Sequence, residues 1–185
     1  MRTDLAALAV TVLLLSSCIV PAPSSEEQQG APADKQAKPA APPLAMKSGA
    51  IIDGRVQILG ATATPGQISP GEGTRIQIYF KVLKKMAEDY TIFVHVEDVD
   101  GRVERMNVDH QPNNGKSPTS EWKEGDTVRD DFGLYLPPGM PVRGLNLWVG
   151  LWEATKDVRL KVTNPSEVRT DGNDRVLLLT VPVVQ

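Results

Sequence analysis

An alternation in which every second residue is apolar, present in three separate stretches, is the feature that most constrains the fold of this chain. The stretches are TRIQIYFKV (74–82), YTIFVHVED (90–98) and GLNLWVGLW (144–152). In each of them, three or four consecutive alternate residues are branched aliphatic residues or phenylalanine. Successive side chains of a β-strand point to opposite faces of its sheet, so this period of two predicts strands that are buried on one face.

Further strands are expected around these three. The evenly apolar DRVLLLTVPVV (174–184) predicts a closing strand, and Pro182 within it favours a sheet edge. Weaker candidates are residues 56–61, 102–108, 127–136 and 158–162. The clusters SPGEG, DVDGR, PNNGKSP, LPPGMP and TDGND have turn chemistry. Seven or eight short strands at this spacing predict an all-β fold, an immunoglobulin-like antiparallel β-sandwich.

The N-terminus has the organisation of an export signal. Arg2 supplies a positive charge, and residues 5–15 are apolar except for Thr11. This run is shorter than the ~20 residues that a membrane-spanning helix needs, and it fits the central region of a signal peptide. It ends in the sequence LSSC, whose Cys18 is the only cysteine of the chain, so an internal disulfide is excluded.

The LSSC sequence resembles the lipobox of bacterial lipoproteins, in which a branched residue and two small ones precede a cysteine. The resemblance implies that residues 1–17 are a lipoprotein signal peptide and that Cys18 carries the acyl chains, palmitate among them. Two or three such chains anchor a protein stably in a membrane. Because Ile19 rather than Asp follows the cysteine, the resemblance favours the outer membrane if the cell is Gram-negative. The alternative is an ordinary signal peptide with an incidental free cysteine.

Composition then divides the remainder of the chain. Residues 18–48, the lipidated cysteine and a segment rich in Pro and Ala, contain no aromatic residue and are predicted to be a disordered linker. Residues 49–185 are predicted to be one β-sandwich domain, long enough to bury a core without disulfides or a metal. The net charge is −3 and no stretch concentrates Lys and Arg, which argues against nucleic-acid binding.

The middle of the chain is similar to a known β-sandwich module. The similarity rests on DYTIFVHVEDVDGR, PTSEWKEGDTVRDDFGLYLP and LWVGLWE, and it covers roughly residues 70–160. The module occurs mainly as an extramembrane appendage of bacterial membrane glycosyltransferases. No activity is assigned to it, so the resemblance implies a fold and no catalytic residues.

No catalytic or metal-binding constellation stands out. His95 and His110 are the only histidines, no G-x-S-x-G elbow accompanies them, and we expect both to be structural. Too few sulfur and imidazole ligands remain for a tetrahedral zinc site. The acidic clusters at 97–100 and 171–174 faintly resemble calcium loops but lack the distal glutamate, so we expect turns there. A pair of carboxylates for glycoside hydrolysis is left open, because sequence does not give their spatial separation.

The tryptophans of the 144–152 stretch are the most interesting candidates for ligand binding. Leu145, Leu147, Val149 and Leu151 are expected to face the core, which places Trp148 and Trp152 on the outer face. Phe93 and His95 would join that surface if their strand lies in the same sheet. Such a surface is either a platform for sugar rings or an aromatic layer covered by a crossing segment, for example the loop at 112–122. We expect the covered arrangement.

These observations leave three classes of function. We expect an envelope lipoprotein, anchored through Cys18, that displays a non-catalytic binding or accessory module to a protein partner or within an envelope assembly. The alternative is a glycan-binding module that uses Trp148, Trp152, Phe93 and His95. An enzyme is the least favoured class. We expect a monomeric domain without a cofactor, a metal or a nucleic-acid partner, located at the bacterial cell envelope.

Overall fold

A computed structural model describes residues 46–185 of the chain. The predicted signal peptide, the acylation of Cys18 and the linker up to residue 45 lie outside the described residues. Within residues 46–185, no helix is long and apolar enough to cross a membrane. What the structure describes is one folded unit, made of nine strands and two short 3-10 turns.

The first sheet has four antiparallel strands in the order β1-β2-β3-β6. They are β1 (Met46–Ile52), β2 (Val56–Thr64), β3 (Gly73–Val82) and β6 (Thr127–Tyr135). The alternation predicted for 74–82 is present in β3, where Ile76, Ile78, Phe80 and Val82 are buried. The intervening side chains of β3, from Arg75 to Lys81, form the outer face of this sheet.

The second sheet is built around β4 (Thr91–Asp98) and β7 (Gly144–Glu153), which pair antiparallel along their whole length. The short strand β5 (Met106–Asn107) lies on the free side of β4. Along the other side of β7 lie β9 (Val176–Pro182) and the two-residue β8 (Val158–Arg159). Pro182 stands at the end of β9, whose ladder is with β7; on its other side β9 makes only isolated bridges, to Thr170 and to Ile68.

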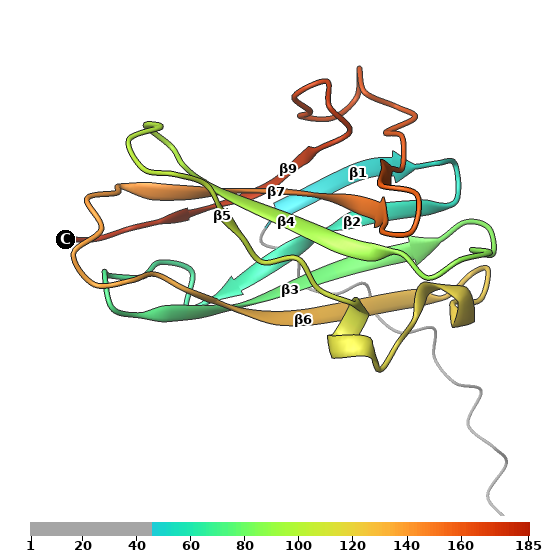
Figure 1. Ribbon diagram of the computed structural model, residues 1–185, viewed down its shortest axis with the longest axis horizontal. Helices are drawn as coiled ribbons and strands as arrows, with labels where there is room; N and C mark the ends of the chain where they lie inside the picture. The colour runs from blue at the N-terminus through green and yellow to red at the C-terminus, as the bar shows by residue number, and fades with distance from the viewer. Residues whose placement is uncertain (1–45) are drawn as a thin grey trace, which may run out of the picture. The chain divides into compact units, whose positions relative to one another are not determined.

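The two sheets pack face to face (Figure 1), and the all-β sandwich predicted from the alternation is confirmed. The core between them consists of aliphatic side chains from both inner faces. From β7 it takes the four residues that the pattern selected, each at most 1% exposed: Leu145, Leu147, Val149 and Leu151. The two tryptophans of β7 therefore lie on the outer face of the second sheet.

Strand β1 begins at Met46, three residues before the boundary expected at 49. Its sequence, MKSGAII, has no alternation at the start, so the pattern did not reveal it. Met46 and Lys47 pair with Ala61 and Gly60 of β2. A Cβ atom on Gly60 would lie only 1.9 Å from the carbonyl oxygen of Met46, so the strand can add here because residue 60 has no side chain.

The outer edge of β1 is closed by the side chain of Asn164 and by an isolated antiparallel bridge between Ile52 and Val162. Asn164 accepts a hydrogen bond from the backbone N–H of Ile51 at 2.8 Å and donates one to the carbonyl of Gly49 at 3.1 Å. The N–H of Thr163 bonds the carbonyl of Ile51 at 2.8 Å. An unpaired edge is a template for association with other chains, so this cover protects the sheet.

Candidate ligand-binding face

The outer face of the second sheet brings together all four residues that the sequence singled out. Phe93 and His95 come from β4, and Trp148 and Trp152 from β7. In the β4–β7 ladder, His95 lies opposite Trp148 and Thr91 lies opposite Trp152. The tertiary structure therefore joins two sequence segments about 50 residues apart into one aromatic surface, as expected if both strands shared a sheet.

The phenylalanine fills the space between the two tryptophans. Phe93 lies opposite Gly150 in the ladder, and a Cβ atom on Gly150 would lie 2.4 Å from its Cζ atom. The ring of Phe93 thus packs against the backbone of β7, and the residue is only 2% exposed. As a result, Trp148 and Trp152 are separated by a buried ring and do not form an open two-ring platform.

Two arginines cover this aromatic row. The guanidinium carbon of Arg159 lies 4.9 Å from the ring centre of Phe93, and that of Arg175 lies 5.2 Å from the ring centre of Trp148. Cations in such positions are attracted by the negative face of the ring. As a result, strand β4 is buried on both faces over most of its length. The alternation of its sequence had predicted burial on one face only.

Arg175 is itself held by three partners. It donates hydrogen bonds to Glu97 and Asp171, each at 2.6 Å, and its Nη1 lies 3.3 Å from Nδ1 of His95. Glu97 is the outward-facing residue of β4 that follows His95. The guanidinium group is therefore fixed over the indole, and the arrangement joins the 157–175 segment to the sheet.

The segment that covers this face is not the one suggested by the sequence. The side chains of Arg159, in β8, and of Arg175, just before β9, lie over it, whereas the 112–122 loop lies elsewhere. Trp122 of that loop packs on Phe80, with ring centres 5.4 Å apart, and its Nε1 donates to the carbonyl of Ser117 at 3.0 Å. Trp122 is 3% exposed and belongs to the hydrophobic core. Sequence alone does not show which loop folds back over a sheet.

Beside the covered row, an open concavity of about 550 Å³ remains. Phe93, His95 and Trp152 line it, while Trp148 does not. Its other walls are mostly charged and come from the approach to the 3-10 turns and from the 157–175 segment: Asp109, Asp157, Val158, Arg159, Lys161 and Asp174. The charged residues of this lining were not singled out by the sequence, because they occupy loops without a recognisable motif.

The carboxylates of the concavity are oriented by hydrogen bonds. Asp109 accepts the N–H of Val94 at 2.8 Å, and Asp157 accepts the indole N–H of Trp152 at 3.1 Å. In each case Oδ1 is used, and Oδ2 has no protein donor within the described part of the chain. Asp174 accepts from Val162 and from Lys161. Two fixed carboxylates thus retain acceptor capacity toward the concavity.

His95 contributes a neutral donor. A guanidinium group only donates, so the contact with Arg175 makes Nδ1 of His95 an acceptor and leaves the ring proton on Nε2. Burial lowers the pKa of His95 below its ordinary value of 6.5, and the charges of Arg105, Arg159 and Arg175 act in the same direction. The imidazole is therefore uncharged at neutral pH.

The other histidine is in a different environment. His110 lies 2.8 Å from Asp130 of β6 through Nε2, and not against its sequence neighbour Asp109. Its Nδ1 lies 2.7 Å from the carbonyl oxygen of Val108, and its ring packs on Phe132 with centres 4.7 Å apart. The partner Asp130 is fully buried and was not singled out by the sequence.

The acidic clusters that resembled calcium loops are turns whose carboxylates bond within the protein. Asp98 accepts the N–H groups of Asp100 and Arg102 around Gly101. Asp171 accepts the N–H of Asn173 and pairs with Arg175. In the part of the chain that the structure describes, no group of three or more His, Cys, Asp or Glu side chains is placed to hold a metal ion.

Comparison with known proteins finds solved structures with low sequence identity to this chain. No protein-family model and no curated protein matches the sequence. Among solved structures, the C-terminal domain of wzt is 12% identical, with a TM-score of 0.45 over 78% of this chain and 83% of that one. A Niemann-Pick type C2 protein from the Japanese carpenter ant is 10% identical, with a TM-score of 0.37 over 75% of this chain and 96% of that one. Of the resemblance noted in the sequence, these comparisons bear on the β-sandwich alone.

Proposed function

We propose that this protein is a lipid-anchored envelope protein whose β-sandwich is a non-catalytic binding module for a neutral glycan. The observation that carries the proposal is the concavity beside Trp152, where an aromatic side chain, two carboxylates with free acceptor oxygens and three donors converge. The lipobox at Cys18 supports the anchoring, and the predicted linker would let the domain reach its ligand away from the membrane.

The size of the concavity suits a short stretch of carbohydrate. Its volume of about 550 Å³ lies within the usual range of ligand sites. It is open along one side, so that a polymer can pass through it without being inserted by an end. An internal segment of a long chain is therefore as good an occupant as a free sugar.

The side chains of the concavity match the chemistry of sugar hydroxyls. Each hydroxyl group is both a donor and an acceptor. Asp109 and Asp157 accept, while His95, Arg159 and Lys161 donate. Trp152 adds a partly exposed indole against which the apolar face of a sugar ring can pack. A contiguous apolar surface would instead favour a protein partner.

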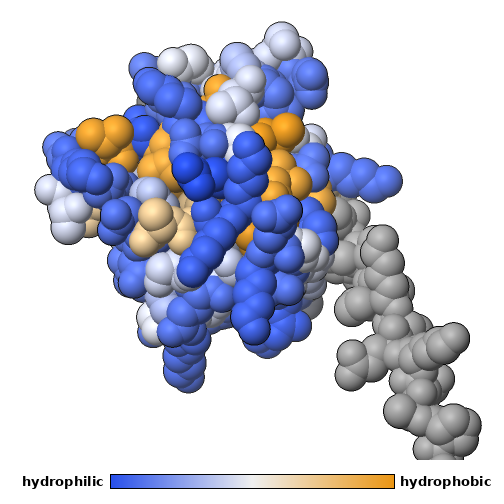
Figure 2. Space-filling view, turned by 90° about the vertical axis from the view of Figure 1, so that its right-hand side faces the viewer, coloured by the Kyte–Doolittle hydropathy of each residue, from blue (hydrophilic) through white to orange (hydrophobic). Residues whose placement is uncertain are grey.

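The charge of the lining favours a neutral ligand over an anionic one. Three carboxylates and two cations line the concavity, and His95 is uncharged. The site therefore carries a formal excess of one negative charge, which repels acidic sugars and phosphates. At the end of the sandwich shown in Figure 2, charged and polar residues predominate and apolar residues form small, separated groups.

The absence of a catalytic role is part of the proposal and rests on how the carboxylates are held. Each of the three accepts a structural hydrogen bond that fixes a backbone or an indole. These bonds hold the carboxylates as acceptors in fixed orientations, and Oδ2 of Asp109 and of Asp157 is available to a ligand hydroxyl. Their arrangement is suited to recognition of an unchanged ligand.

The test is titration calorimetry of the full chain in detergent with three probes: chitohexaose, maltohexaose and the acidic hexagalacturonate. We expect one of the two neutral probes to bind and the acidic one to bind at least tenfold more weakly. Asp109→Asn keeps the acceptor for Val94 but replaces the free oxygen by a donor, and should weaken binding about 3- to 10-fold, the usual effect of one hydrogen bond. Asp126→Asn, a matched change on an exposed loop of the other sheet, should leave binding unaltered.

Failure of both neutral probes, or equal effects of the two substitutions, would count against the glycan site. Preferential binding of hexagalacturonate would show that the charge argument is wrong. In either case the accessory role with a protein partner, expected from the sequence, would become the leading hypothesis. Crosslinking of the intact protein in its native envelope would then identify the partner.

A further inference from the structure

In the pairing between β4 and residues 106–110, one backbone hydrogen bond is replaced by a bond to a side chain. Ile92 and His110 exchange both backbone hydrogen bonds, each at 3.0 Å. Two residues along, the N–H of Val108 bonds the carbonyl of Val94 at 2.9 Å, as a regular antiparallel pair requires. The reciprocal bond is missing, because the N–H of Val94 donates to the carboxylate of Asp109 at 2.8 Å.

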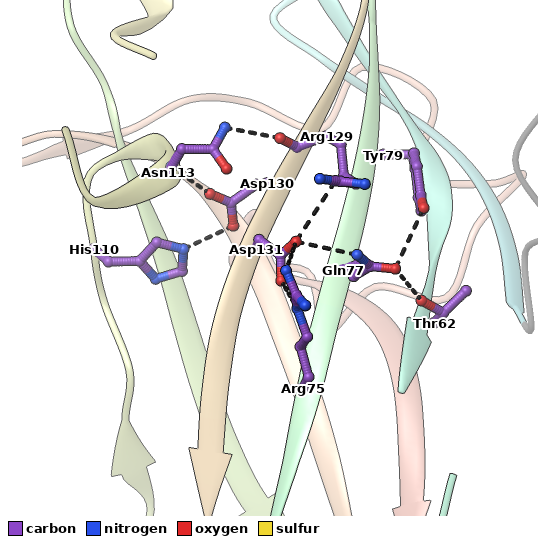
Figure 3. A network of polar contacts seen from close by, with 9 residues as sticks. All are labelled: Thr62, Arg75, Gln77, Tyr79, His110, Asn113, Arg129, Asp130 and Asp131. Atoms are coloured by element: carbon purple, nitrogen blue, oxygen red, sulfur yellow. Dashed lines mark hydrogen bonds and ion pairs between the residues drawn. The ribbon is translucent and has the colours of Figure 1, made fainter. Parts of the chain in front are cut away.

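The carbonyl oxygen that Val94 would normally bond is occupied by His110. Nδ1 of His110 lies 2.7 Å from the oxygen of Val108. Nε2 of the same ring lies 2.8 Å from Oδ2 of Asp130, whose Oδ1 accepts the N–H of Asn113 at 2.7 Å. Figure 3 shows this contact, with His110 and Asn113 on one side of β6. The imidazole therefore competes with the N–H of Val94 for this oxygen.

This geometry requires an extra proton. A carbonyl oxygen carries none, so Nδ1 must donate to Val108. A second proton must then lie between Nε2 of His110 and Oδ2 of Asp130, because otherwise two lone pairs would face each other at 2.8 Å. Burial by itself would lower the pKa of His110, but the hydrogen bonds to Asp130 and Val108, with the charges of Asp130 and Asp109, raise the pKa above its ordinary 6.5.

We propose that the proton shared by His110 and Asp130 holds the carboxylate of Asp109 in the concavity, so that ligand binding there weakens when the pair loses this proton. The effect on a ligand rests on the proposed function. The movement of Asp109 does not, because it follows from the contacts of His110 with Val108 and of Val94 with Asp109.

Loss of the proton leaves one hydrogen on the ring. It stays on Nε2, since Asp130 is a fully buried carboxylate and the stronger acceptor. Nδ1 then presents a lone pair to the carbonyl oxygen of Val108, 2.7 Å away, which is repulsive. The carbonyl turns back to its ladder partner, the N–H of Val94. Asp109 is displaced and has no second protein donor among the described residues.

The charged groups around His110 are few. Asp130 faces it from β6, and Asp109 acts on it from its own segment. Strand β4 contributes the backbone of Ile92, and β6 also contributes the apolar ring of Phe132. Arg129 and Asp131 of β6 pair with each other on the opposite side of the strand, away from the imidazole (Figure 3). The response to pH is therefore governed by the His110–Asp130 pair.

The test is a pH titration of the full chain by ¹H–¹⁵N NMR between pH 5.5 and 9. We expect His110 to change from the doubly protonated ring to the Nε2–H tautomer with a midpoint above 6.5, and the amide signal of Val94 to move with the same midpoint. A Val94 signal that stays constant while His110 titrates would overturn the proposal. So would a neutral His110 with its proton on Nδ1.

Two substitutions separate the switch from general destabilisation. Asp130→Asn keeps an acceptor for Asn113 and offers an amide donor to Nε2, which keeps a ring proton on Nδ1 when the imidazole is neutral. In Asp130→Asn, the amide signal of Val94 should not change with pH. It should lie close to the position that the unsubstituted protein shows at the acid end of the titration. Asp131→Asn removes the same charge from the neighbouring residue on the other side of β6, and should titrate as the unsubstituted protein does. Identical behaviour of the two variants would overturn the proposal.

Calorimetry with the neutral hexasaccharides completes the test. Affinity of the unsubstituted protein should fall about 3- to 10-fold between pH 6 and 9, as expected for one lost hydrogen bond, and affinity of Asp130→Asn should not. If neither sugar binds but Val94 titrates, the proposed function fails and the switch stands. If a sugar binds with the same affinity at both pH values, the switch does not act on the site.

Discussion

The ring of Phe93 packs directly against Gly150, which faces it across the β4–β7 ladder. Any side chain at residue 150 would occupy the position of the ring, since a Cβ atom there would lie 2.4 Å from Cζ of Phe93 and 2.9 Å from the carbonyl oxygen of Asp174. The ring of Phe93 therefore fills the space between Trp148 and Trp152, and the lack of a side chain at Gly150 lets the backbone of Asp174 lie close to the sheet.

Gly150→Ala should accordingly destabilise the protein although alanine is small. The second contact is with backbone, which cannot rotate away, so we expect a loss of about 1–3 kcal/mol, the usual cost of overpacking. Urea unfolding of the full chain measures it. Gly133→Ala on β6, where a Cβ atom meets nothing within 4 Å, is the matched control and should change stability little. Equal effects would show that the contact is not rigid.

Trp148 and Trp152 should differ in what they contribute. Trp148 lies beneath Arg175 with its indole nitrogen buried, so Trp148→Ala should cost about 2–4 kcal/mol of stability, slightly less than a fully buried Trp. Trp152 borders the concavity, and Trp152→Ala should cost about 1–2 kcal/mol while abolishing measurable sugar binding. Denaturant unfolding and calorimetry on both variants decide this. Loss of binding in Trp148→Ala without loss of stability would contradict the assignment.

Stability in acid should depend on Asp171. Burial by itself would raise its pKa, but the hydrogen bonds from Arg175 and Asn173 outweigh this and lower the pKa to about 2 from the ordinary 3.8. Folding thus favours the ionised carboxylate of Asp171, which contributes about 1–2 kcal/mol to the free energy of unfolding after solvent screening. This stabilisation is complete above pH ~4, and it is lost as the pH falls through about 2. Thermal unfolding between pH 5 and 2 should show a shallower decline for Asp171→Asn. Arg175→Gln should reduce the same decline, and an unchanged profile in both would refute the pairing.

The side-chain cover of β1 predicts a defined role for Asn164. In Asn164→Ala the N–H of Ile51 loses its acceptor, and we expect a loss of about 1–2 kcal/mol. Hydrogen exchange of the Ile51 amide should accelerate more than that of other β1 amides. Glu167→Ala removes only another partner of the Asn164 amide, and should cost less than about 0.5 kcal/mol. If the Ile51 amide exchanges at the same rate in both variants, Asn164 does not protect the edge.

The lipid anchor is tested on the intact cell. Mass spectrometry of membrane-extracted protein should give a mature chain that begins at Cys18 and carries added acyl mass. Cys18→Ser should either release the domain from the membrane or leave the precursor uncut. A mature protein that begins elsewhere and has a free thiol would refute the lipobox assignment and favour the ordinary signal peptide.

The sequence by itself determined the class of fold and the outward direction of the key aromatic residues. Period-two alternation in 74–82, 90–98 and 144–152 is a local property of the backbone, because neighbouring side chains of any strand point to opposite faces. It was therefore sufficient to place Leu145 and Val149 in the core and Trp148 on the outer face. It was insufficient for β1, whose place depends on the lack of a side chain at Gly60.

Only the tertiary structure decided what lies over that outer face and what surrounds it. Arg159 and Arg175 cover the aromatic row and Asp109 enters the concavity because loops distant in sequence fold onto β4 and β7. The pairing of His110 with Asp130, rather than with the adjacent Asp109, joins the edges of the two sheets. Such contacts depend on how chain segments meet in space. A hydrophobic pattern indicates only which side of a strand is buried, and not which charged side chain lies against the other side.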